Sequence, residues 1–352
     1  MADDGMFSLA GQTAVVIGGG GVLAGAMALG LARAGADIAI VDVNLENAEA
    51  RAHAIAATGR QAMGIRCDAT SKADLESALA AAIGRFGRVD TLINAAGINS
   101  GTPFFEIGEA EWQRILDIDL KSVFLACQVF GKAMVEAGRG GSIINISSAS
   151  AGPPLSKVFT YSIAKAGINQ ITQFLARDLA PHNVRVNAIQ PGFFPAEQNR
   201  KLLTDERVAS IMTHTPMNRF GDSEELVGAA VYLASPRASS FVTGSILRVD
   251  GGFLAMLATW QTWVLLIVGG GGFFLLQNAL QAGRLVASQP GITLANPLVA
   301  GVCGVGLFHE QVRTGPWLLG AGLGAALLAA GAVLLSSSPL LVGHQEAPDN
   351  DG

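Results

Sequence analysis

Cysteine and basic side chains are scarce in this chain of 352 residues, and each scarcity excludes a class of protein. The three cysteines, Cys67, Cys127 and Cys303, are far apart, which argues against a disulfide framework and a zinc site. We therefore expect no metal and a reducing compartment. Lysine and arginine number 23 against 28 acidic residues, without the basic stripe of a nucleic-acid-binding protein. The first five residues carry two aspartates and no basic group, so we expect no secretory signal.

Charge is missing above all from the last quarter of the sequence. Residues 1–256 hold 21 basic and 24 acidic side chains, whereas residues 257–352 hold only six charges. Long uncharged runs cover residues 251–283, 285–308 and 314–343, and each exceeds the length of about 20 residues that crosses a bilayer as a helix. We therefore predict three membrane spans, near residues 261–281, 287–308 and 316–336.

This pattern predicts three parts of the chain. Residues 1–256 would form one domain, residues 257–343 a membrane segment with three helices, and residues 344–352 an acidic tail. The alternative is that the uncharged runs form buried helices of a second soluble domain. Arg284 and Arg313 are the only basic residues of that segment, which leaves too few polar groups for a water-exposed exterior. The composition therefore favours membrane helices.

A glycine-rich turn follows the first predicted strand. Residues 13–17 form a short apolar run, residues 18–21 are four glycines, and residues 22–34 form an alanine-rich helical stretch. A second buried strand, residues 36–41, is followed by Asp42. In dinucleotide-binding units such glycines let the backbone approach the pyrophosphate, and a carboxylate after the next strand accepts hydrogen bonds from ribose hydroxyls. Asp42 would repel a 2′-phosphate, so we expect NAD rather than NADP; a plain tight turn is the alternative reading.

The alternation of strands and helices continues along the chain. Further strands are predicted at residues 62–67, 91–93, 142–146, 184–189 and 245–249, and further helices at residues 73–86, 109–136 and 161–179. Such repetition predicts an α/β fold with a doubly wound parallel sheet of the Rossmann type, covered by helices on both faces. Ligands bind beyond the carboxyl ends of such strands. That edge would hold Gly18, Asp42, Asp68, Asn94, Ser148 and Pro191.

Tyr161 and Lys165 are four residues apart on a predicted helix, so their side chains share one face. A neighbouring cation stabilises a phenolate, which would let Tyr161 exchange a proton while hydride moves to or from a nicotinamide. The pair by itself is a common coincidence on a helix surface. It gains weight because the chain has only two tyrosines and because Ser147 and Ser148 follow a strand shortly before it.

With these motifs the chain resembles the short-chain dehydrogenases/reductases, over roughly residues 7–254. Ser148 lies 13 residues before Tyr161, the separation usual in that family. The resemblance implies that Ser148 hydrogen-bonds the substrate oxygen, that Tyr161 is the acid/base, and that Lys165 binds the nicotinamide ribose and tunes Tyr161. It implies an NAD-dependent enzyme that acts on a secondary alcohol or a ketone, and a possible homo-oligomer.

The same resemblance implies which residues contact the cofactor. They are Gly18, Gly21, Leu23, Asp42, Asp68, Ala69, Asn94, Ala95, Gly97, Tyr161, Lys165, Pro191, Gly192 and Phe194. The chain departs from the family pattern at Ile17, Ala24, Asp119 and Ala196. Asp119 replaces an asparagine that orders a proton-relay water in many members, so we count it with the catalytic residues and expect altered turnover.

Residues 193–201 resemble a loop of members that act on sugar acids such as mannonate or fructuronate. Arg200 or Lys201 would pair with a carboxylate, and Gln198 and Asn199 with hydroxyls. The alternative is that this loop is only the solvated start of a helix above the active site.

Residues 260–342 resemble the last three membrane helices of drug/metabolite-type transporters. Three spans are too few for a complete transporter of that kind, so this tail would be a membrane anchor or the product of a fusion of unrelated fragments. We therefore expect a membrane location with the catalytic domain in the cytoplasm; a cytoplasmic protein is the alternative. Other possible functions are an anchored NAD-binding protein without turnover and a transporter-related redox sensor.

Overall fold

The computed structural model describes residues 5–152, 155, 157–195 and 204–256, together with Gly324, Leu327 and Ala330. The chain divides into two compact units, Met1–Met256 and Leu257–Gly352. All elements described below belong to the first unit.

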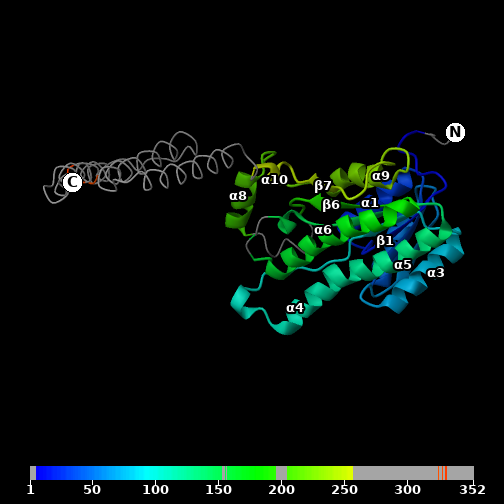
Figure 1. The fold of residues 1–352 in the computed structure, drawn as a ribbon, viewed down its shortest axis with the longest axis horizontal. Helices are drawn as coiled ribbons and strands as arrows, with labels where there is room; N and C mark the ends of the chain where they lie inside the picture. The colour runs from blue at the N-terminus through cyan, green and yellow to red at the C-terminus, as the bar shows by residue number, and fades with distance from the viewer. Residues whose placement is uncertain are drawn as a thin grey trace, which may run out of the picture. The chain divides into compact units, whose positions relative to one another are not determined.

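A parallel sheet of seven strands forms the centre of the first unit (Figure 1). The strands are β1 (Thr13–Ile17), β2 (Asp37–Asp42), β3 (Ala62–Arg66), β4 (Thr91–Asn94), β5 (Gly141–Ile146), β6 (Val184–Pro191) and β7 (Ile246–Val249). Their order is β3-β2-β1-β4-β5-β6-β7. The direction of winding therefore reverses between β1 and β4, and ligands bind at such a reversal in open α/β sheets.

Helices cover both faces of the sheet, and each face has its own apolar core. The helices are α1 (Val22–Arg33), α2 (Leu45–Ala56), α3 (Lys72–Phe86), α4 (Glu109–Leu116), α5 (Ser122–Ala137), α6 (Phe159–Leu179), α8 (Asp205–His214), α9 (Val227–Ala234) and α10 (Phe253–Met256). Helices α1, α2 and α9 pack on one face, and α3, α5 and α6 on the other. Figure 1 shows α9 on one side of the strands and α3 and α5 on the other.

Strand β1 shows how the sequence produces two cores. Ala14 and Val16 point into the core under α1, whereas Val15 and Ile17 point into the core under α3 and α5. Successive side chains of a strand point to opposite faces, so a strand covered on both sides is apolar throughout. The predicted α/β class and parallel sheet are confirmed.

The long helix predicted over residues 109–136 is not continuous. Helix α4 ends at Leu116, a π-helical turn (η2, Asp117–Lys121) follows, and α5 begins at Ser122. A π-turn inserts one residue into the helix without breaking its direction, so the apolar spacing of the sequence does not reveal it. Helices α2, α8 and α9 were not among the predicted elements; α2 buries only Ala48, Ala52 and Ile55, which gives a weak apolar pattern.

The three predicted spans lie outside the described residues, apart from Gly324, Leu327 and Ala330, which are helical. The resemblance of residues 260–342 to transporter helices falls on the same segment. Within the part of the chain that the structure describes, no helix combines the length and apolarity needed to span a bilayer.

Candidate active site

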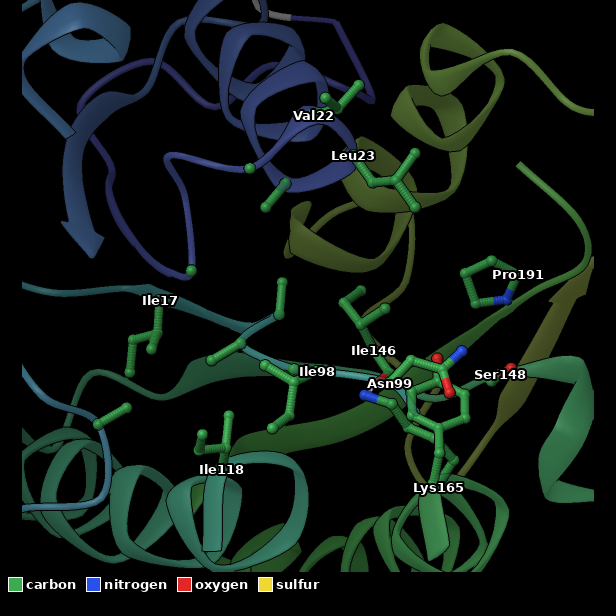
Figure 2. Close-up of a pocket in the computed structure, with 18 of the residues that line it drawn as sticks. Ile17, Val22, Leu23, Ile98, Asn99, Ile118, Ile146, Ser148, Lys165 and Pro191 are labelled. Carbon is green, nitrogen blue, oxygen red and sulfur yellow. Dashed lines mark hydrogen bonds between the residues drawn. The ribbon is translucent and has the colours of Figure 1, made fainter. Parts of the chain in front are cut away.

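A cavity of about 1250 Å³ opens at the carboxyl edge of the sheet, where the winding reverses. Ligand cavities are usually about 300–1,000 Å³, so this one has room for a dinucleotide and a second small molecule. Figure 2 shows Ile17 at one end of the cavity, Pro191 and Ser148 at the other, and Val22 and Leu23 on the wall opposite Ile118. Residues that follow six different strands, β1 to β6, therefore meet in one space.

The glycine turn between β1 and α1 forms one wall of the cavity. Gly18 has a φ of 75°, and a Cβ there would lie 2.6 Å from the backbone nitrogen of Ala96. Only glycine fits this close approach of two loops. Gly21, at the N-cap of α1, supplies no side-chain cap, so the first backbone N–H groups of α1 remain available at the cavity wall. Free N–H groups at a helix N-terminus favour a phosphate.

The Asp42 carboxylate lies in the cavity wall beside this turn and is held by the backbone. Its Oδ2 accepts a hydrogen bond of 3.0 Å from Gly20 N, and its Oδ1 accepts one of 3.0 Å from Asn44 N. Arg51, on α2, also lines the cavity and packs against Gly25. Arg51 is nine residues after Asp42, so the residues next to Asp42 in the sequence did not reveal this cation. The close-packed turn, the free helix terminus and the fixed carboxylate fit a dinucleotide.

Ser148, Tyr161 and Lys165 line the same cavity. Ser148 follows β5, and its Oγ accepts a hydrogen bond of 3.2 Å from Ser150 N. Tyr161 and Lys165 lie one turn apart on α6, with Lys165 Nζ 5.4 Å from the centre of the Tyr161 ring. Figure 2 shows the side chains of Ser148, Lys165 and Asn99 at one end of the cavity. The three residues selected from the sequence are therefore brought together, although they come from two elements.

Lys165 is buried, and two groups hold its ammonium. Nζ donates a hydrogen bond of 3.0 Å to Ile146 O and lies 3.7 Å from Asp119 Oδ2. Asp119 is fully buried in the π-turn, and its Oδ1 accepts a hydrogen bond of 2.8 Å from Ile98 N. Burial raises the pKa of the Asp119 carboxyl, and the nearby Lys165 ammonium opposes that shift. Asp119 is therefore a partner of Lys165 behind the cavity wall, and its effect on turnover stays a prediction.

Most of the residues predicted to contact a cofactor line the cavity. They are Gly18, Gly21, Leu23, Asp42, Asp68, Ala69, Ala95, Gly97, Tyr161, Lys165, Pro191, Gly192 and Phe194. Asn94 is the exception, because its amide turns into the protein and donates a hydrogen bond of 2.8 Å to Asn145 Oδ1. Ala196, Gln198, Asn199, Arg200 and Lys201 lie outside the described residues.

The structure adds cavity residues that the sequence analysis missed. Asn99, Arg51, Arg207 and Phe220 all line the cavity. None belongs to a motif with a fixed spacing, and Arg207 lies on α8, a helix that was not predicted. The available signal was the sequence Thr204-Asp205-Glu206, which resembles a helix start, followed at once by an arginine.

Comparison with known proteins identifies the family to which this fold and site belong. A family model described as enoyl-(acyl carrier protein) reductase matches residues 21–254. An uncharacterized oxidoreductase UxuB of Bacillus subtilis is 41% identical over 269 residues, covering 70% of this chain and 96% of that protein. The chain belongs to the short-chain dehydrogenase/reductase family. The 2-dehydro-3-deoxy-D-gluconate 5-dehydrogenase of Escherichia coli, a further relative, is 36% identical and covers 71% of this chain and 98% of its own length.

Solved structures of short-chain dehydrogenases/reductases share the fold of the first unit. A gluconate 5-dehydrogenase from Burkholderia cenocepacia, in complex with NADP and tartrate, is 32% identical with a TM-score of 0.68, covering 71% of this chain and 98% of that one. A proposed D-mannonate oxidoreductase from Haemophilus influenza with bound NAD is 35% identical with a TM-score of 0.67, covering 70% of this chain and 96% of that one. The protein is an NAD(P)-dependent oxidoreductase that acts on CH–OH groups.

Proposed function

We propose that the protein oxidises a secondary alcohol of a sugar acid with NAD, or reduces the corresponding ketone with NADH. The observation that carries this proposal is the meeting of Ser148, Tyr161 and Lys165 in one cavity with the glycine turn and Asp42. A dinucleotide on that turn would direct its nicotinamide toward Pro191 and Gly192. The proton-transfer groups and the cofactor site then share one cavity.

The chain's own residues would handle the proton and the substrate oxygen. The nicotinamide supplies or accepts hydride when it is bound. The Tyr161 phenolate would take the proton of the substrate alcohol during oxidation, and the Tyr161 hydroxyl would give that proton to the ketone oxygen during reduction. Ser148 Oγ would donate a hydrogen bond to that oxygen and hold it beside Tyr161. The Lys165 ammonium would stabilise the phenolate of Tyr161, which lies one helical turn away.

Asp42 supports a preference for NAD within this proposal. A carboxylate at this position accepts hydrogen bonds from the ribose hydroxyls and repels a 2′-phosphate. Its two backbone hydrogen bonds fix it in place before any cofactor arrives. The positive charge of Arg51 lines the same cavity and would attract a 2′-phosphate. The preference for NAD therefore rests on Asp42 alone.

The names of the relatives support a sugar acid as substrate. The relatives include a 2-dehydro-3-deoxy-D-gluconate 5-dehydrogenase, a gluconate 5-dehydrogenase and a D-mannonate oxidoreductase, and one of these structures holds tartrate, a hydroxylated dicarboxylate. All of these compounds carry a carboxylate and adjacent hydroxyl groups. We propose the same class for this chain.

The test is NADH formation by the purified protein with gluconate, mannonate and related sugar acids, compared with neutral polyols and simple secondary alcohols. We expect turnover of at least one sugar acid with NAD. The Tyr161→Phe variant should lose turnover by about 100-fold or more, because the acid/base is removed, while its dissociation constant for NADH stays within about twofold. Full activity of this variant would refute the assigned chemistry.

Asp119 favours a second candidate function, an NAD-binding protein without turnover. A carboxylate at 3.7 Å holds the Lys165 ammonium more tightly than an amide would, and it would draw the ammonium away from Tyr161. The same experiment separates the two functions. Tight binding of NADH with no turnover of any alcohol or acid, restored by Asp119→Asn, would establish the second.

A further inference from the structure

Arg207 places a cationic group in the wall of the cavity. It is the third residue of α8, whose first turn is capped by Thr204: the Thr204 Oγ1 accepts a hydrogen bond of 3.3 Å from Arg207 N. The Nη1 atom of the guanidinium is buried and has no hydrogen-bond partner among the described residues. Within the same part of the chain, Arg207 also forms no ion pair.

Arg207 as a whole is only partly buried, but its Nη1 atom has lost contact with water and gains no hydrogen bond among the described residues, which is unfavourable for a charged group. The carboxylates that line the cavity belong to its other parts. Asp42 and Asp68 follow β2 and β3, and Asp117 pairs with Lys121 at 3.5 Å. Four strand spacings separate β2 from β6, the strand that precedes α8, a distance of about 19 Å. None of these carboxylates forms an ion pair with Arg207 in the described part of the chain.

The segment around Arg207 belongs to the substrate end of the cavity. Thr215, directly after α8, lies against Gly251, where a Cβ would be 3.0 Å from its Cγ2. Two residues further on, Phe253 packs its ring 5.1 Å from that of Phe193, in an apolar cluster with Ala149. Ala149 directly follows Ser148, which would hold the substrate oxygen. The phosphate-binding wall, at Val22 and Leu23, comes from the start of α1 instead (Figure 2). An anion at Arg207 is therefore expected from the substrate and not from the cofactor's diphosphate.

We propose that Arg207 binds the carboxylate of the sugar-acid substrate and so sets the preference for acids over neutral polyols. This inference rests on the proposed function and adds the residue that recognises the acid. The planar guanidinium offers two N–H groups in the geometry of a carboxylate. It fixes one end of the substrate while Ser148 and Tyr161 receive the alcohol group.

The test compares the wild-type protein with Arg207→Met and Arg207→Lys, using gluconate and its neutral counterpart glucitol. Arg207→Met should raise KM for gluconate about 10- to 100-fold, the loss expected for one charged hydrogen-bonding partner, with a smaller change in kcat. Turnover of glucitol should change less than about threefold. Arg207→Lys keeps the charge but loses the two parallel N–H groups of the guanidinium. Its KM for gluconate should lie between those of the wild type and Arg207→Met. The dissociation constant for NADH should stay the same in every variant.

Calorimetric binding of gluconate and glucitol to the full-length protein with NADH gives a second readout that needs no turnover. The wild-type protein should bind gluconate more tightly than glucitol, and Arg207→Met should remove the difference. If the wild type turns over no sugar acid but shows this pattern, the proposed function fails and the carboxylate site stands. If the wild type turns over gluconate and Arg207→Met keeps the preference for it, the proposal for Arg207 is refuted.

Three further variants control for charge and for competing residues. Arg177→Met removes an exposed arginine on α6 that pairs only with its neighbour Asp178 in the described structure, and it should change nothing. Arg200→Met and Lys201→Met test the two cations that the sequence analysis favoured. Loss of acid preference in either of these, with none in Arg207→Met, would also overturn the proposal.

Discussion

At the scale of single residues, the backbone fixes the Asp42 carboxylate in the cavity wall. Both of its oxygens accept backbone hydrogen bonds, from Gly20 and from Asn44, so its position does not depend on a ligand. A Cβ at Gly20 would lie 2.8 Å from Asp42 Oδ2, so the carboxylate can occupy this place only if residue 20 is glycine. Arg51 lines the same cavity, and its charge is opposite.

Asp42→Ala should relax the preference for NAD. We expect kcat/KM with NADP to rise about tenfold or more relative to that with NAD, because repulsion of the 2′-phosphate is removed and Arg51 remains. Steady-state kinetics with both cofactors measures the ratio. The double variant Asp42→Ala with Arg51→Met should lose part of the gain. An Asp42→Ala protein that still rejects NADP would contradict the role given to the carboxylate.

At the scale of elements, the π-turn η2 between α4 and α5 places Asp119 against Lys165. Single π-turns often occur at functional sites. Gly97 allows the close approach, since a Cβ there would lie 2.8 Å from Asp119 Oδ2. The turn, which leads into α5, therefore contacts both the loop after β4, through Ile98, and Lys165 of α6.

Asp119→Asn should change the pH dependence of stability. Burial raises the pKa of Asp119 in the folded protein above its value in the unfolded chain. The protonated carboxyl therefore contributes its full share to the free energy of unfolding below the unfolded pKa, and this contribution is lost as the pH rises through the folded pKa. Asparagine does not ionise, and its Oδ1 still accepts from Ile98 N. The difference in free energy of unfolding, variant minus wild type, should grow from pH 4 to pH 8 in urea titrations. A difference that shrinks over this range would show that the Lys165 pair outweighs burial.

The 3₁₀ turn η5 (Ser223–Leu226), which leads into α9, carries a second pH-dependent group. Glu225 accepts hydrogen bonds of 2.7 and 2.6 Å from Arg219 and one of 2.8 Å from Asp222 N. The Arg219 hydrogen bonds lower the pKa of Glu225 to about 2. A carboxyl group whose pKa is lowered by folding stabilises the protein when the pH is above the pKa of the unfolded chain. This stabilisation is lost as the pH falls through the pKa of the folded protein.

Glu225→Gln should therefore lower the melting temperature at pH 7. The difference from the wild type should narrow as the pH falls from about 4.5 toward 2, where the wild-type carboxyl becomes protonated. Differential scanning calorimetry across this range measures it. Glu224→Gln is the matched control, because its exposed pair with Arg33 should contribute almost nothing. An equal loss in both variants would assign the effect to general surface charge.

At the scale of the whole molecule, the relatives correspond to the first unit alone. The curated and solved relatives match 70 or 71% of this chain with 96 to 98% of their own length. The first unit, Met1–Met256, contains both apolar cores and the whole described cavity. Attachment of the chain to a membrane by residues 257–343 stays a prediction from composition.

A chain ending at Met256 should keep its fold and its catalytic activity. We expect kcat/KM within about threefold of the full chain, because no described cavity residue is removed, and a melting curve with one cooperative transition. If the tail anchors the protein, the full chain should remain in carbonate-washed membranes and the shortened chain should be in the supernatant. An unfolded shortened chain would mean that the first unit needs the tail.

Local patterns of the sequence determined the strands, the glycine turn, Asp42 and the trio of Ser148, Tyr161 and Lys165. Strand and helix periodicity and the position of a residue after a strand are properties of short segments. A parallel sheet then brings the strand ends to one edge, so residues far apart in the sequence are predicted to meet there.

Tertiary structure alone decided the contacts that depend on the direction of a side chain and on distances between segments. Asn94 has the predicted place after β4, yet it turns into the core toward Asn145. Asp119 reaches Lys165 because a π-turn shifts it by one residue, and Arg207 reaches the cavity from a polar helix with no motif. The physical reason is that the packing of several elements against one another determines the position of a charged atom and whether a partner lies beside it. The spacing of residues within one element does not determine either.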